Sequence, residues 1–148
     1  MEIQKITNTS FNDSYYHSVH PSGLNIYVYP KKDYNSTYAI FGTKYGSINT
    51  SFKLPGQDTI VKTPDGIAHY LEHKMFESKE GDAFKLYSHT GASANAYTSF
   101  DKTCYLFSCT ENFEESLKIL INSVQNPYFT DENVQKEQGI IGQEITMY

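Results

Sequence analysis

A chain of 148 residues is long enough for one domain whose core needs no disulfide or bound metal. Hydrophobic residues make up 39% and aromatic residues 15% of the chain, which excludes a disordered protein. The formal net charge of −5, from 12 basic and 17 acidic residues without a dense lysine cluster, argues against a nucleic-acid partner.

Strand-forming residues dominate the first part of the chain, after a polar segment at 1–22 that gives no clear assignment. Residues 24–30 (LNIYVYP) and 36–47 (STYAIFGTKYGS) are rich in β-branched and aromatic side chains, which predicts two strands. Pro55 and Gly56 predict a turn after them.

A helical region follows. Asp65 in TPDG is suited to cap a helix, which we expect to run to about Ser78, where EGD interrupts it. A short second helix is predicted from about Asp82 to His89, because Gly91 stands where a left-handed helix end would lie.

The rest of the chain predicts a hairpin and two more helices. Residues 92–99 and 102–110 are typical of two strands joined by a short turn. Apolar residues at helical spacing follow from Glu111 to the next proline. Thr130 or Asp131 then caps a last helix that reaches the C-terminus.

These elements predict the α+β class, with an antiparallel-rich sheet packed on helices. We assign residues 1–148 to a single domain. The last helix has no termination signal, so we expect this domain to be partial, truncated at its C-terminal side and part of a longer protein.

The cysteines and the apolar segments bear on the cellular compartment. Cys104 and Cys109 are five residues apart in a predicted strand, an odd separation that puts their side chains on opposite faces, so we predict two reduced thiols. No signal peptide is visible in MEIQKITNTS, and no stretch approaches the roughly 18 apolar residues of a membrane span. We therefore expect a cytoplasmic protein with no membrane partner.

Two of the five histidines lie in one short stretch, GIAHYLEHKMFES. His69, Glu72 and His73 occupy positions i, i+3 and i+4 of the predicted helix and project from one face. Two imidazoles one turn apart can bind a single Zn²⁺, and the glutamate can act as general base toward the water on that metal. A helical histidine is more often a hydrogen-bonded residue than a ligand, but His-x-x-Glu-His is the inverted zinc signature, so we predict a zinc site.

A catalytic zinc usually takes a third protein ligand, and the last predicted helix offers two carboxylates. Glu137 and Glu144 are seven residues apart, about two turns, so both lie on one face. Gly139 and Gly142, each costing roughly 1 kcal/mol in a helix interior, suggest close packing against another element, for which the helix with the histidines is the natural candidate. The alternative is that both glutamates are solvated and the glycines mark a frayed end.

The predicted strand GASANAYTS consists of small and polar residues around Asn95. Small side chains let a second backbone approach, so an edge strand of this kind can pair with an extended peptide, which Asn95 can hold with its amide. The residues alone favour the alternative, a plain edge strand with a turn-seeking asparagine.

Three segments together resemble a known family: DGIAHYLEH, GASANAYTSFDKTCYLFSC and QNPYFTDENVQKEQGIIGQEI. In this order they resemble the pitrilysin/insulinase (M16) family of zinc metallopeptidases, which includes mitochondrial processing peptidases and insulin-degrading enzymes. The resemblance runs from about Asn25 onward and is greatest to a bacterial, YmfH-like subgroup. It implies that the chain is the first, incomplete half of a pitrilysin-like clamshell built from two similar α/β halves.

The resemblance also implies a role for each matching residue of the metal site. His69 and His73 match the two zinc-binding histidines of the family, and Glu72 matches the general base. Glu144, the second of two glutamates seven apart, matches the third zinc ligand. Glu137 matches a carboxylate that supports a ligand without binding the metal, and it is the alternative third ligand.

The family's substrate-pairing strand is matched by Asn95, Ala96, Tyr97 and Thr98. The resemblance therefore implies zinc-dependent hydrolysis of peptides or small unfolded proteins, with one zinc ion. The C-terminal remainder of the chain, or a paired pitrilysin-like subunit, would complete the substrate site, so we expect the isolated chain to be weakly active or inactive. The alternatives are a non-catalytic partner subunit, a peptide-binding module, or a zinc protein that acts on one specific partner protein.

Overall fold

The structure, a computed structural model, describes residues 1–79 and 81–147 and contains two compact units. The first unit is Met1–Asn35 and the second is Ser36–Tyr148, whereas a single domain at 1–148 was predicted. Antiparallel sheets and helices together confirm the predicted α+β class. All residues predicted for the site lie in the second unit.

The first unit is a three-stranded antiparallel sheet. Its strands are β1 (Ile3–Asn8), β2 (Asp13–Val19) and β3 (Asn25–Val28), in the order β1-β2-β3. Strand β3 lies inside the strand predicted at 24–30. Strands β1 and β2 had no sequence assignment because neither IQKITN nor DSYYHSV alternates apolar and polar residues.

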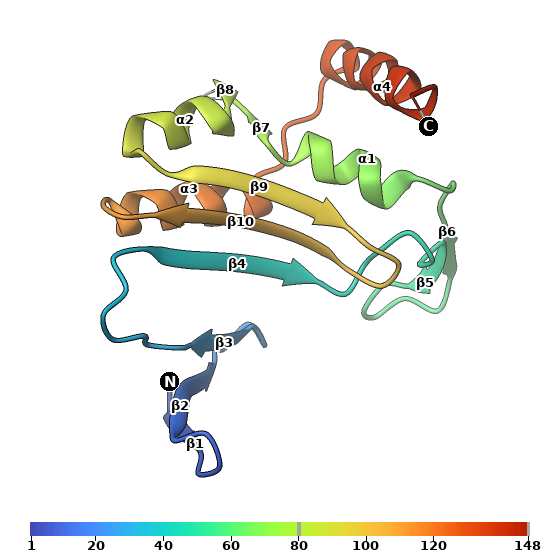
Figure 1. The fold of residues 1–148 in the computed structure, drawn as a ribbon. Helices are drawn as coiled ribbons and strands as arrows, with labels where there is room; N and C mark the ends of the chain where they lie inside the picture. Colours follow the sequence, from blue (N-terminus) through green and yellow to red (C-terminus); the bar gives the residue numbers. More distant parts are fainter. Residues whose placement is uncertain (80, 148) are drawn as a thin grey trace. The chain divides into compact units, whose positions relative to one another are not determined.

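A second sheet, in the order β4-β10-β9, organises the second unit (Figure 1). It consists of β4 (Thr37–Thr43), β9 (Ser93–Thr98) and β10 (Thr103–Cys109), with both pairs antiparallel. The predicted hairpin is confirmed: β9 and β10 are adjacent, and their turn is closed by a hydrogen bond from Ser99 N to Lys102 O of 2.8 Å. Among the described strands, β9 pairs only with β10, so it forms one edge of this sheet.

One face of this sheet carries the core. Tyr105, Phe107 and Cys109 alternate along β10 and are buried against Tyr87 and Leu120. These last two residues belong to the helices α2 (Ala83–Thr90) and α3 (Phe113–Gln125), which confirm two predicted helices. The predicted left-handed end of α2 is also confirmed, because the φ of Gly91 is +75°.

The two cysteines follow the predicted pattern. Both thiols are free and buried, Cys109 within the core cluster and Cys104 at a β10 position of opposite orientation. Burial raises the pKa of the Cys109 thiol, which keeps that thiol protonated near neutral pH.

Two short hairpins flank the first helix of the chain. Strands β5 (Ser51–Lys53) and β6 (Ile60–Lys62) enclose the predicted turn, where Gln57 N donates to Leu54 O at 3.0 Å. Strands β7 (Glu77–Ser78) and β8 (Gly81–Asp82) form the other hairpin.

The helix between them, α1 (Ile67–Lys74), is shorter than predicted. Its N-cap is Gly66, with φ +84°, and not Asp65. The helix ends before Ser78 because the chain is drawn into β7, where Ser78 pairs with Gly81.

The last helix, α4 (Asp131–Ile145), begins at Thr130, whose hydroxyl and the side chain of Asn133 form a capping box. It lies beside α1, which in turn lies beside β9 (Figure 1). The expectation that Gly139 and Gly142 serve close packing is wrong, because a Cβ added at either glycine would meet no atom within 4 Å apart from the adjacent backbone of its own helix. Within the described residues no helix is long and apolar enough to cross a membrane.

Candidate metal centre

Helix α1 places the two predicted histidines next to each other. His69 and His73 are one turn apart, and their Nε2 atoms are separated by 3.2 Å. The imidazole planes are inclined at 82°, so the rings do not stack, and their Nε2 atoms lie close enough to bind one ion.

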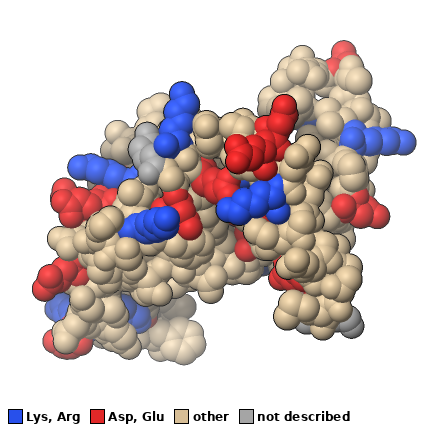
Figure 2. Space-filling model, turned by 90° about the horizontal axis from the view of Figure 1, so that it is seen from above, with Lys and Arg blue, Asp and Glu red and all other residues tan. Residues whose placement is uncertain are grey.

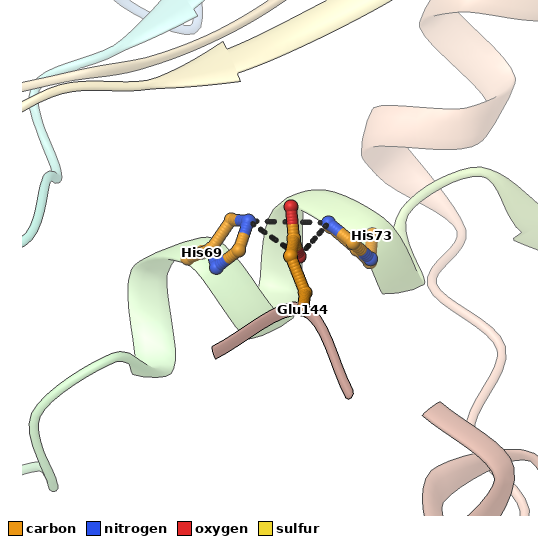
Figure 3. Close-up of side chains that lie close together, drawn as sticks. All are labelled: His69, His73 and Glu144. Atoms are coloured by element: carbon orange, nitrogen blue, oxygen red, sulfur yellow. Dashed lines mark hydrogen bonds and ion pairs between the residues drawn. The ribbon is translucent and has the colours of Figure 1, made fainter. Parts of the chain in front are cut away.

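Helix α4 supplies a carboxylate to the same point. The Oε2 atom of Glu144 lies 3.7 Å from Nε2 of His69 and 3.8 Å from Nε2 of His73. Figure 3 shows this carboxylate between the two rings. Oε2 of Glu144 is itself buried, and among the described residues it has no hydrogen-bond partner.

Glu137 approaches His73 from the other side of the ring. Its Oε1 atom is 2.7 Å from Nδ1 of His73, and its side chain is among the most buried carboxylates of the chain, at 8% exposure. A carboxylate at this distance is best satisfied when Nδ1 carries the proton and donates it. Nε2 of His73 is then an unprotonated acceptor that faces His69 and Glu144.

These three ligand atoms fit a zinc ion. Bonds of about 2.0 to 2.2 Å to nitrogen and oxygen place the ligands of a tetrahedral ion about 3.3 to 3.6 Å apart. The observed separations of 3.2, 3.7 and 3.8 Å are close to this range. A bound cation would also satisfy the buried Oε2 of Glu144, which otherwise bears an uncompensated desolvation cost. Two imidazoles and one carboxylate are a common donor set of catalytic zinc.

Glu72, predicted as general base, lies on the same helix and is held by a contact that the sequence did not predict. The hydroxyl of Thr98, on β9, donates to Oε2 of Glu72 at 2.6 Å. The charge of Glu72 also reaches the core: burial, and after it Glu72, raise the pKa of the Tyr105 phenol.

The predicted peptide-pairing residues all lie on β9, at the open edge of the sheet. Asn95 and Tyr97 are exposed, whereas Ala96 and Thr98 are half-buried on the side of the helices. The N–H of Ala96 donates to Oδ1 of Asn95 at 2.8 Å, so this main-chain group is not used in pairing with β10.

A cavity of about 370 Å³ adjoins both the metal centre and β9. Its lining includes Glu72, His73, Phe76, Asn95, Ala96 and Glu137. The candidate ligand His73, the candidate base Glu72 and the sheet edge at Asn95 and Ala96 therefore border one open space.

Sequence reasoning also missed the contacts that join α1 to its surroundings. The hydroxyl of Tyr70 donates to the main-chain oxygen of Val134 in α4 at 3.0 Å. Lys74 is fully buried and forms an ion pair with Glu77. Burial, and after it Glu137 and Glu77, raise the pKa of the Tyr70 phenol, so its hydroxyl keeps its proton.

Charged side chains of both signs are mixed on one face of the molecule. On the face shown in Figure 2, lysine side chains (blue) and acidic side chains (red) are interspersed among the described residues, without a broad surface of one sign. The described part of that face therefore offers no patch of one charge sign to which a charged partner could bind.

Comparison with known proteins relates the chain to a family. The profile of the insulinase family (peptidase family M16) matches residues 61–148. The chain is 54% identical over 146 residues to the uncharacterised zinc protease YmfH of Bacillus subtilis strain 168, covering 99% of this chain and 34% of that protein. It thus spans about a third of the length of this relative.

Solved structures agree with the sequence comparison. The crystal structure of an M16-like peptidase from Alicyclobacillus acidocaldarius matches with a TM-score of 0.83 at 41% identity, covering 99% of this chain and 32% of that one. The crystal structure of pitrilysin matches with a TM-score of 0.72 at 18% identity, covering 98% of this chain and 16% of that one. At this identity the likeness to pitrilysin concerns the fold alone.

Proposed function

The chain belongs to the insulinase family, peptidase family M16, and from this premise we propose that its metal centre binds one Zn²⁺ and serves the hydrolysis of peptide bonds. The convergence of His69, His73 and Glu144 on one point carries the proposal. Relatives described as zinc proteases support it, since they share most of this chain's length.

Each residue of the centre has a distinct task in this proposal. His69 and His73 hold the ion through Nε2, and Glu144 holds it through Oε2. Zinc, when bound, lowers the pKa of a coordinated water toward about 7 and polarises a carbonyl oxygen. Glu137 accepts the Nδ1 proton of His73, which fixes the tautomer and the orientation of that ring.

Glu72 is the proton carrier of the proposed reaction. Its carboxylate accepts a proton from the attacking water and passes it to the leaving amine. The hydrogen bond from Thr98 limits the orientations of this carboxylate, so that it stays close to the metal centre.

The open edge of β9 orients the peptide. An extended peptide can pair with main-chain groups such as the N–H of Ala96, and a peptide carbonyl would there replace the Oδ1 atom of Asn95. The side chains of Asn95 and Tyr97 flank the same edge from the exposed side. Peptides and small unfolded proteins can become extended without unfolding cost, which makes them the proposed substrate class.

Metal analysis tests the ligand set. We expect one zinc per wild-type chain, and a loss of zinc affinity of at least about a hundredfold in Glu144→Ala, beyond the ten- to hundredfold typical of a supporting residue. Glu137→Gln should fall within that smaller range, and Glu132→Ala, an exposed carboxylate of the same helix, should change nothing. A greater loss in Glu137→Gln than in Glu144→Ala would assign the third ligand to Glu137.

Glu72→Gln in the full-length protein tests the general base. We expect zinc content to remain at one per chain while peptide hydrolysis falls by about a hundredfold or more, because proton transfer loses its acceptor. Full activity of Glu72→Gln would remove Glu72 from the mechanism.

A further inference from the structure

Helix α4 carries the proposed ligand Glu144 but buries little apolar surface. Glu137 is its buried residue, whereas Ile140 and Ile145 are 43% and 71% exposed. Its less exposed positions are Asn133, Val134, Glu137, Ile141 and Glu144, and the last four recur at helical spacing. Only two of these five are apolar, so apolar burial contributes little to holding α4 against its neighbour.

Polar contacts with α1 therefore decide where α4 lies. Glu137 meets His73, and Glu144 meets His69 and His73, so the two helices run in opposite directions. The third contact is the hydrogen bond of 3.0 Å from the Tyr70 hydroxyl to the main-chain oxygen of Val134. It differs from the others because it involves neither a proposed metal ligand nor the partner of one.

The place of this bond suits a positioning role. Tyr70 follows His69 directly in the chain, and its hydroxyl reaches the first turn of α4, ten residues before Glu144. It ties α4 to the same short helix that carries both imidazoles. A helix fixed at its first turn and at Glu137 has little freedom to swing Glu144 away from the histidines.

We propose that Tyr70 is a positioning residue, which holds α4 on α1 and so keeps Glu144 in place for the metal. The inference rests on the proposed metal site and adds a residue outside its ligand set. A net hydrogen bond of ordinary strength then contributes to metal affinity, because the ion binds tightly only when α4 is in place.

Tyr70→Phe removes the hydroxyl and keeps the ring. In competition titrations with a chromogenic zinc chelator, we expect its dissociation constant for zinc to rise about fivefold. The matched control is Tyr45→Phe, which also removes a half-buried hydroxyl with a hydrogen bond, to Thr63 at 3.3 Å, but away from α4. Tyr45→Phe should bind zinc as wild type does.

A double-mutant cycle separates positioning from a general loss of stability. If Tyr70 acts through Glu144, Tyr70→Phe has no further effect on zinc affinity in the Glu144→Ala background, with titrations extended to millimolar zinc. An equal loss in both backgrounds, or wild-type affinity in Tyr70→Phe, would overturn the inference and leave the proposed function intact.

Hydrogen exchange of the metal-free protein gives an answer that does not depend on zinc. We expect the amides of α4 to exchange faster in Tyr70→Phe than in wild type, while the amides of α3 do not change. Unchanged exchange in α4 would overturn the role of Tyr70. Absence of zinc binding in the wild type would instead overturn the proposed function, so the two failures are distinguishable.

Discussion

At the scale of single residues, Thr98 connects the proposed peptide-pairing strand with the candidate base Glu72. From sequence it belongs with the peptide-pairing residues of β9, but its hydroxyl donates to Glu72 at 2.6 Å. A hydroxyl engaged with the candidate base contributes to orienting the carboxylate. The peptide would meet the main chain of Thr98 and not its hydroxyl.

Thr98→Val in the full-length protein removes this hydroxyl at nearly constant volume. Hydrogen bonds to charged groups contribute about 1.5 to 3 kcal/mol, so we expect kcat to fall about tenfold or more. KM and zinc content should change little, because neither the main chain of β9 nor the ligand set is altered. Steady-state kinetics with a quenched fluorescent peptide measures both constants.

Thr98→Ser is the matched control, since it keeps the hydroxyl and should retain most of the wild-type kcat. A rise of KM at constant kcat in Thr98→Val would show instead that the hydroxyl binds the peptide. A loss of kcat in Thr98→Ser with wild-type kcat in Thr98→Val would show that the methyl group matters and the hydrogen bond does not.

At the scale of elements, α4 is a helix with two interior glycines that no neighbour requires. A Cβ at Gly139 or Gly142 would meet open space, and neither glycine has a positive φ. Gly139→Ala and Gly142→Ala should each therefore raise the free energy of unfolding by about 0.5 to 1 kcal/mol. Denaturant unfolding followed by circular dichroism measures the change.

Gly46→Ala is a control for which we expect the opposite effect on stability. A Cβ at Gly46 would lie 2.5 Å from Lys102 N and Ser99 O, at the turn between β9 and β10, so this substitution should destabilise the protein severely. Destabilisation by Gly139→Ala or Gly142→Ala would show instead that the close packing expected from sequence exists in solution.

Some features of the helices could be predicted from residue spacing alone. Helix α1 and its convergent histidines follow from spacing alone, because i, i+3 and i+4 lie on one helix face whatever the tertiary structure is. Glu137 and Glu144 follow from the same argument, and the structure brings both to α1.

Contacts between segments far apart in the chain could not be predicted from residue spacing. Tyr70 and Val134 are 64 residues apart, and Thr98 and Glu72 are 26 apart, so only the packing of α4 and β9 on α1 reveals them. The glycines of α4 misled the prediction because a glycine shows what the chain permits locally and not what lies beside it.

At the scale of the whole molecule, metal binding and catalysis have different requirements. The three proposed ligands lie within the second compact unit, so they need no further chain to converge. A peptide on the edge of β9 would contact this chain along one side, and the chain spans about a third of its relative's length. Further groups that hold the peptide would come from additional residues or from a paired subunit.

We therefore expect residues 1–148 alone to bind zinc but to hydrolyse peptides far more slowly than the full-length Bacillus subtilis relative. Positioning a substrate from both sides can contribute several orders of magnitude in rate, so a loss of about a hundredfold is a conservative expectation. Turnover per bound zinc, measured for both proteins with the same peptide mixture, excludes incomplete metal loading as the cause. Equal turnover would show that this chain holds the complete catalytic apparatus, and a Glu72→Gln sample in parallel would exclude a contaminating protease.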